Sequence, residues 1–228
     1  MIRLSAVVCL VLAGCGSEPV GLPDVQGLTP VVNLSDEAGV VEVELVASES
    51  SVDWVEGGST PVWSYNGVVP GPLIQARVGD TLRVHLTNQL PESTTIHWHG
   101  LRIPDTMDGV PMIQAPVEPG ETFTYEFTLP DAGTFWYHPH VRGNEQIERG
   151  LQGMLVVHEA EPPPFDVERG FVIDDAAVRD GGRLYGFGLM GMDAVHGRFG
   201  NVLMVNGATA VTTEHVSGLL KRALPGIQ

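Results

Sequence analysis

Cysteine is almost absent from this sequence, and both copies lie near its start, at Cys9 and Cys15. The rest of the 228-residue chain therefore offers neither a disulfide nor a thiolate ligand for a metal. Basic residues are also few, 12 against 28 acidic ones, and the formal net charge is −16. Such a surface repels phosphate backbones, so we expect no nucleic-acid partner.

Apolar runs long enough to cross a bilayer are missing as well. The stretch from Ser5 to Ala13 is too short to span a membrane as a helix, and Arg3 precedes it. This arrangement predicts an export signal, and the Leu-Ala-Gly-Cys sequence at 12–15 resembles the cleavage box of bacterial lipoproteins. We therefore expect residues 1–14 to be a lipoprotein signal peptide and Cys15 to carry lipid. The protein would then be extracytoplasmic, periplasmic or at the cell surface, and anchored to a membrane. An ordinary cleaved signal is the alternative.

Helical periodicity is also lacking, and short strand patterns with turns between them take its place. Strands are expected at 41–45, 73–78, 81–87, 122–129, 134–137 and 154–157. Gly79-Asp80 lies between the second and third of these strands and predicts a hairpin. Many short strands at this spacing indicate an all-β sandwich or barrel.

Two composition changes divide the chain. Residues 15–34 are rich in glycine, proline and serine and are interpreted as a tether. The prolines at 162–164 cannot donate hydrogen bonds to a sheet, so one domain is expected over 35–160. Strands at 171–174 and 202–205 would belong to a second domain at 165–228. Those roughly 65 residues fall short of the roughly 100 that a closed sandwich usually needs, so the second domain is expected to be incomplete.

Two His-X-His segments carry the clearest chemical pattern, His97-Trp98-His99 and His138-Pro139-His140. In an extended chain, residues i and i+2 project to the same side, so each pair can face one point. Imidazole suits copper, zinc, iron and nickel, and copper(II) binds most strongly in the divalent series, but spacing alone does not choose the metal. The isolated histidines are interpreted as structural; they are His85, His158, His196 and His215.

The motifs around these histidines resemble those of the multicopper oxidases, the group of laccases and cuproxidases. The likeness runs from about Ser64 to Gly207. In order, it includes Asn66-Gly67, Pro70-Gly71-Pro72, Gly79-Asp80, Thr95–Gly100, Met107–Pro111, Pro119–Glu121, Ala132–Thr134, Trp136–His140 and Gly150–Met154. The resemblance implies a Greek-key cupredoxin β-sandwich of the family's N-terminal type, followed here by an incomplete second cupredoxin-like domain, with copper as the cofactor.

The same resemblance implies a role for each site residue. The family binds a trinuclear copper cluster through four His-X-His segments, two from the first domain and two from the last. By position, His97 would bind the type 2 copper, and His99, His138 and His140 the paired type 3 coppers. Asp108 matches an acidic residue that delivers protons while oxygen is reduced to water. A plain turn aspartate before Gly109 is the alternative.

Other parts of the family pattern are missing. The family's type 1 copper needs a cysteine within a His-Cys-His segment, and the sequence has neither that cysteine nor a third or fourth His-X-His segment. The likeness fades after Ala208, so we expect a truncated chain with a divergent tail over 212–228. We accordingly expect no oxidase turnover from the chain alone.

Three functions remain open. The first is the N-terminal portion of a multicopper oxidase, which couples oxidation of a one-electron donor, phenolic or a metal ion, to reduction of O2. The second is a non-enzymatic, extracytoplasmic copper-binding lipoprotein that sequesters the metal. The third is a split enzyme in which a partner chain supplies the missing ligands.

Overall fold

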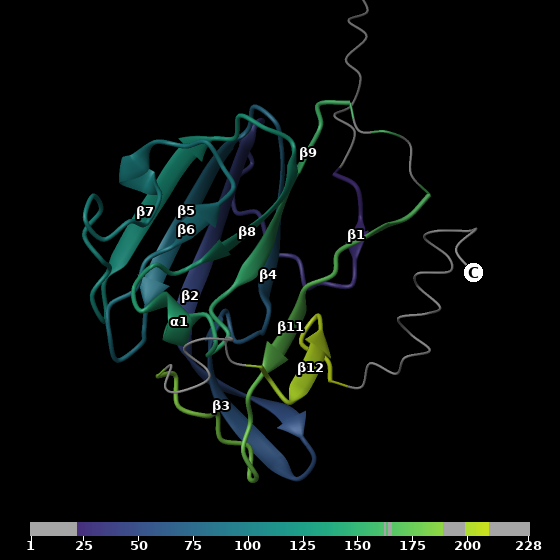
Figure 1. The fold of residues 1–228 in the computed structure, drawn as a ribbon. Helices are drawn as coiled ribbons and strands as arrows, with labels where there is room; N and C mark the ends of the chain where they lie inside the picture. The colour runs from purple at the N-terminus through teal and green to yellow at the C-terminus, as the bar shows by residue number, and fades with distance from the viewer. Residues whose placement is uncertain (1–21, 162, 164–165, 189–198, 210–228) are drawn as a thin grey trace, which may run out of the picture.

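Two four-stranded sheets contain most of the strands of this computed structural model, which describes residues 22–161, 163, 166–188 and 199–209 (Figure 1). One sheet has the order β3 (Gly58–Tyr65), β2 (Val40–Val55), β5 (Thr81–Asn88) and β7 (Thr122–Thr128). The other has the order β4 (Gly71–Arg77), β9 (Gly153–His158), β8 (Gly133–His138) and β6 (His97–His99). The β2–β5 and β4–β9 pairs are parallel, and the other neighbours are antiparallel. The predicted all-β sandwich is confirmed.

Alternation along each strand explains why the two sheets pack together. In β5, Leu82, Val84 and Leu86 are fully buried, whereas Arg83 and His85 lie on the outer side. The core between the sheets includes the large aromatic side chains of Trp98, Tyr125 and Tyr137, all 0% exposed. Burial of one such ring stabilises the fold by roughly 2–3 kcal/mol, so β6 and β8, which supply two of them, are firmly attached to the core.

The predicted hairpin around Gly79-Asp80 is wrong. The strands on either side, β4 and β5, belong to different sheets. Gly79 has a φ of +92°, and its N–H donates to the Leu129 carbonyl at 2.8 Å, while Asp80 accepts the N–H of Arg77 at 2.8 Å. The turn therefore carries the chain across the sandwich edge, because β4 finds its partner in β9 and β5 fits between β2 and β7.

Two further strand pairs lie beside the sandwich. β1 (Val25–Gln26) pairs in parallel with β10 (Glu168–Arg169), so residues within the predicted tether contact the folded chain. β11 (Ile173–Ala176) pairs antiparallel with β12 (Val202–Val205), which confirms the strand expected at 202–205. The strand expected at 171–174 begins two residues later, because the Val172 N–H donates to the Asn206 side chain at 2.7 Å.

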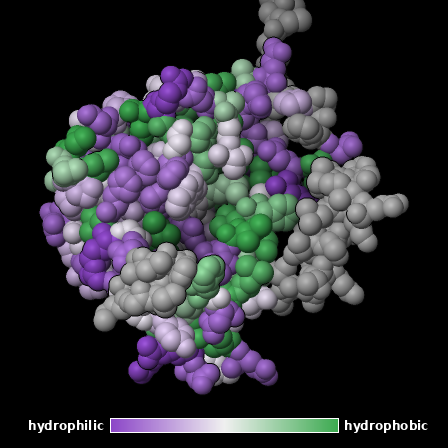
Figure 2. Space-filling view, in the orientation of Figure 1, coloured by the Kyte–Doolittle hydropathy of each residue, from purple (hydrophilic) through white to green (hydrophobic). Residues whose placement is uncertain are grey.

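The β11–β12 pair has one covered and one open face. Met204 and Ala176 are buried against Trp54 and Val62 of the sandwich. The opposite face exposes Ile173 by 71% and Leu203 by 58%, and apolar side chains gather in this region in Figure 2.

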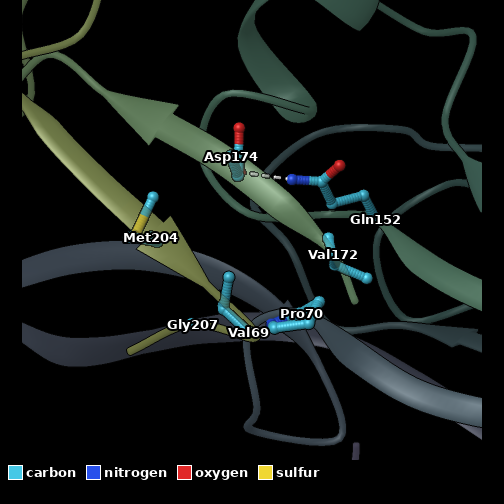
Figure 3. A pocket seen from close by; sticks show the side chains of 7 residues that line it. All are labelled: Val69, Pro70, Gln152, Val172, Asp174, Met204 and Gly207. Carbon is cyan, nitrogen blue, oxygen red and sulfur yellow. Dashed lines mark hydrogen bonds between the residues drawn. The ribbon is translucent and has the colours of Figure 1, made fainter. Parts of the chain in front are cut away.

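Asp174 lies on the covered face of β11. Its carboxylate accepts a hydrogen bond from the Gln152 side chain at 2.5 Å, beside a small pocket (Figure 3). Burial raises the pKa of Asp174, and the nearby charge of Glu148 adds to that effect. The contact between the β11–β12 pair and the sandwich thus shields this carboxylate partly from water.

Among the described residues, helical structure is confined to single turns. They are η1 (Asp105–Met107) and α1 (Gly143–Gln146), both too short to leave a periodic pattern in the sequence. No helix among the described residues has the length and apolar composition needed to cross a membrane. Cys15, His196, His215 and the tail at 212–228 lie outside the described part of the chain.

Candidate metal centre

The pairing of β6 with β8 brings the two His-X-His segments together. His97 lies opposite His138, Trp98 opposite Tyr137 and His99 opposite Trp136. Because the side chains alternate, Trp98 and Tyr137 point into the core and are 0% exposed. His97 and His99 consequently project from the other face of the sheet, on the same side as His138. The sequence prediction that His97 and His99 project to the same side is met at this edge of the sandwich.

All four histidine rings gather at that face. The His97 ring centroid lies 5.3 Å from that of His99, 5.2 Å from His138 and 4.1 Å from His140, on which it stacks. Nδ1 of His99 is 3.2 Å from Nε2 of His138. One nitrogen from each of His97, His138 and His140 lies within 4.8 Å of the others, which is close enough to share a metal ion.

Asp108 fixes the ring of His97. The Nδ1 atom of His97 lies 2.9 Å from Oδ1 of Asp108 and 3.2 Å from the Asp108 carbonyl oxygen. Both oxygens can only accept hydrogen bonds, so Nδ1 must carry the proton and Nε2 must have the free lone pair. Asp108 therefore orients a potential metal ligand, as carboxylates do behind many metal-bound histidines.

A similar contact fixes His138. Its Nδ1 donates to the Pro139 carbonyl at 3.1 Å, which leaves the lone pair of Nε2 to accept a hydrogen bond from the Nδ1–H of His99. Trp136 lies against this ring, with the centroids 4.0 Å apart, and shields one side. A metal ion at this point would replace the proton that the two nitrogens share.

Burial keeps two of these rings neutral. It lowers the pKa of His138 to about 4, and the charges of His97, His140 and His99 act in the same direction. Burial also lowers the pKa of His140, with His97 as the next cause. Neutral imidazole is the form that binds metals, so both side chains are in the binding form at neutral pH.

Hydrogen bonds to the backbone hold the His138–His140 segment. The N–H of His140 donates to the hydroxyl of Thr95 at 3.1 Å, which joins it to the residues before His97. Behind it, the buried side chain of Gln146 accepts from the Thr94 hydroxyl at 2.8 Å and donates to the Glu92 carboxylate at 2.8 Å. Sequence reasoning named Thr95 only as part of the Thr95–Gly100 motif and missed Gln146, because a polar residue near a motif does not reveal its partner. Their only signal is position next to the ligand segments.

The remaining histidines of the described chain lie elsewhere. His85 contacts Glu42 at 2.8 Å on the outer face of its sheet, and His158 contacts Gln75 at 3.0 Å. Neither belongs to the cluster of potential ligands.

The donor set fits copper. All four side chains offer imidazole nitrogen, which suits copper in both of its common oxidation states. Two of the rings have their other nitrogen fixed by an oxygen acceptor, as ordered metal ligands require.

Comparisons with known proteins agree with this geometry. A protein-family model described as "Multicopper oxidase" matches residues 47–162, a span that includes both histidine segments. Multicopper oxidase MmcO of Mycobacterium tuberculosis is 36% identical over 170 residues, which cover 72% of this chain and 33% of that protein. Laccase-1 of Cryptococcus neoformans var. grubii is 43% identical over 127 residues, or 54% of this chain and 20% of the laccase.

Solved structures give the same result for the fold. The multicopper oxidase of Pseudomonas thermotolerans superposes with a TM-score of 0.72 at 43% identity, over 75% of this chain and 42% of that one. The enzyme from Campylobacter jejuni, described as a metallo-oxidase, gives a TM-score of 0.73 at 31% identity and covers 83% and 41%. This chain thus spans well under two thirds of the length of these relatives. Its sandwich is a cupredoxin fold, and the chain belongs to the multicopper oxidase family, whose cofactor is copper.

Proposed function

We propose that this chain supplies the N-terminal half of the copper site of a multicopper oxidase. The observation that carries this proposal is the convergence of the four imidazoles of His97, His99, His138 and His140 at one edge of the first sandwich. The activity proposed for the whole protein is oxidation of a one-electron donor, a phenol or a metal ion, coupled to reduction of O2 to water. Bound copper would supply the one-electron chemistry.

Each histidine has a proposed place in that site. His97 would hold the type 2 copper through Nε2, the nitrogen that Asp108 leaves free. His99 and His138 would hold one type 3 copper, which is supported by the 3.2 Å between their facing nitrogens. His140, which stacks on His97, would hold the other.

Asp108 has two proposed tasks in the same site. It accepts a hydrogen bond from Nδ1 of His97, and its side chain is 24% exposed. A carboxylate that touches both a ligand and water is suited to deliver protons to the site during oxygen reduction. The turn role, which the sequence left as an alternative, is compatible with this one, because the Asp108 N–H also closes the η1 turn.

The remaining features are part of the same proposal. Lipid on Cys15 would anchor the protein to a membrane outside the cytoplasm, and 35–160 would form the first cupredoxin domain, with 165–228 forming part of a second. A partner chain would contribute the missing histidines and the type 1 cysteine if the enzyme is split. A reading frame directly downstream that encodes a His-Cys-His segment would settle whether the chain is truncated.

A second candidate function is copper sequestration without turnover. It is supported by the three ligand nitrogens from His97, His138 and His140, which lie within 4.8 Å of one another in this chain alone. Such a site can hold copper without a partner, although with positions left open.

Copper loading of the purified chain tests these functions. We expect metal analysis to show bound copper, no absorbance band near 600 nm, and no oxygen uptake with a phenol or a cuprous salt. Oxygen uptake by the loaded chain would show that it is a complete oxidase. A chain that binds no copper would contradict both candidates.

A further inference from the structure

A buried glutamine holds the turn that carries Asp108. We propose that Gln114, together with Tyr125, is a positioning residue that locks His97 in the ring orientation and tautomer needed for metal binding. This inference rests on the proposed role of His97 as a copper ligand. It concerns a different part of the chain, because the side chain of Gln114 forms its hydrogen bonds with Gly109 and Tyr125 rather than with a histidine of the site.

Gln114 links the turn to the core with both ends of its amide. Its Oε1 accepts the N–H of Gly109 at 3.0 Å, and its Nε2 donates to the hydroxyl oxygen of Tyr125 at 2.9 Å. The side chain is only 4% exposed, although Met112 and Ile113 just before it are 92% and 51% exposed. A buried amide of this kind is retained in place, because breaking either bond leaves an unpaired polar group.

Tyr125 connects that amide to the ligand strand. Its hydroxyl oxygen also accepts the N–H of Ile96 at 2.7 Å, one residue before His97. Tyr125 is 0% exposed and its ring packs edge-on against Trp98, with the centroids 5.7 Å apart. One oxygen atom, rigidly supported by β7, thus ties Ile96 and Gln114 to the same point.

The turn fits against the ligand strand with no room to spare. A Cβ atom on Gly109 would lie 2.1 Å from the Ile96 carbonyl oxygen, and the φ of Gly109 is +67°. The hydrogen bond from Gly109 to Gln114 holds this glycine against Ile96, and it thereby fixes the position of Asp108 relative to His97. In that position both the carboxylate and the carbonyl of Asp108 face Nδ1 of His97.

The consequence is a preset ligand. Because the two Asp108 oxygens accept the Nδ1–H of His97, the proton stays on Nδ1 and Nε2 is free before any metal arrives. If the turn loosens, the ring can rotate and take up the other tautomer. Partners that orient a metal-bound histidine typically change metal affinity by about 10- to 100-fold, and we expect Gln114 to act within that range through Asp108.

The test compares Gln114→Met with the unaltered full chain. Methionine keeps the length of glutamine and removes both hydrogen bonds. Long-range ¹⁵N–¹H NMR on the metal-free protein identifies which ring nitrogen of His97 is protonated. We expect the Nδ1-protonated form in the unaltered chain and a mixture in the variant. Copper(II) affinity, measured by competition with a chromophoric chelator, should fall about 10- to 100-fold.

Three comparisons make the result specific. Gln75→Met removes a contact to His158 instead, and should change neither the tautomer of His97 nor copper affinity. Asp108→Asn combined with Gln114→Met should weaken copper binding no more than Asp108→Asn alone, because both act on one contact. If Gln114→Met does not fold, Tyr125→Phe removes only the shared oxygen and should give the same tautomer change.

The inference is overturned if the folded variants keep the His97 tautomer unchanged, whatever their copper affinity. If Gln114→Met changes the His97 tautomer but the unaltered chain binds no copper, the positioning role is supported and the proposed function is contradicted. The two claims therefore fail separately.

Discussion

Nδ1 of His99 and Nε2 of His138 face each other at 3.2 Å across the β6–β8 pair, with a single proton between them. His138 cannot provide that proton, because its own Nδ1 donates to the Pro139 carbonyl. The metal-free protein therefore holds two ligand nitrogens at one point by a hydrogen bond.

Replacement of His138 by glutamine should remove much of the copper binding. Glutamine retains most of the volume against Trp136 but loses the imidazole nitrogen. Loss of partners behind a ligand already costs about 10- to 100-fold in metal affinity, so we expect loss of a direct ligand to cost at least about tenfold. Competition titration with copper(II) measures this change. His85→Gln, on the outer face of its sheet, is the matched control and should bind copper like the unaltered chain. Equal copper(II) affinity for the two variants would show that His138 is not a copper ligand.

Gly109→Ala should damage the site more than an equivalent change elsewhere. Gly120 is the natural comparison, because its φ of +84° is also positive but no atom lies within 4 Å of the Cβ position, whereas at Gly109 the Ile96 oxygen lies at 2.1 Å. Left-handed backbone costs about 1–2 kcal/mol for alanine at either position. Urea unfolding should therefore show a larger loss for Gly109→Ala than for Gly120→Ala. Only Gly109→Ala should also weaken copper binding. A similar loss from both variants would mean that the turn moves freely.

Alternation in the sequence was sufficient for much of this structure. It placed the strand at 81–87 to within a residue, since every second side chain is buried there. The strand at 202–205 was also placed correctly, but as a short apolar run without alternation. The same rule put His97 and His99 on one face. It could not determine strand pairing, and so Gly79-Asp80 was wrongly predicted to form a hairpin: a turn reverses the chain whichever sheet follows.

The details of the site depend on contacts that no local pattern contains. The resemblance to the oxidases named Asp108, but its hydrogen bond to His97 depends on how the irregular segment between β6 and β7 folds back on β6. Gln114 in that segment has no periodic neighbours, and its partner Tyr125 belongs to another strand. Polar residues buried in irregular segments are where sequence reasoning has least to work with.

Gln146→Leu should destabilise the segment that follows His140. The Gln146 amide is 0% exposed and bonds to the Thr94 hydroxyl, the Glu92 carboxylate and the Ser93 carbonyl. Leucine leaves the buried Thr94 hydroxyl and the partly buried groups of Glu92 and Ser93 without that partner, at a cost of about 1–3 kcal/mol. Chemical unfolding measures the loss. Gln89→Leu, at an exposed position, is the control and should change stability by no more than about 0.5 kcal/mol. A Gln146→Leu variant as stable as this control would show that the network contributes nothing.

Asp174→Asn should stabilise the protein at neutral pH, because burial raises the pKa of Asp174 above the ordinary 3.8. A raised carboxyl pKa means that the folded state favours the neutral form. The associated stability is complete below pH 3.8 and is lost as the pH rises through the folded pKa. Asparagine remains neutral throughout, and its side-chain oxygen can still accept from Gln152, as the carboxylate in Figure 3 does.

Thermal unfolding of both proteins between about pH 4 and pH 7 measures this difference. The melting temperature of Asp174→Asn relative to the unaltered chain should rise with pH, by about 2–4 °C for each kcal/mol recovered. Asp36→Asn is the control: it also removes one negative charge from the chain, but at an exposed position. It should give a flat difference over the same range. A pH-independent difference for Asp174→Asn would mean that Asp174 titrates as it does in water, and that the contact between the β11–β12 pair and the sandwich leaves it solvated.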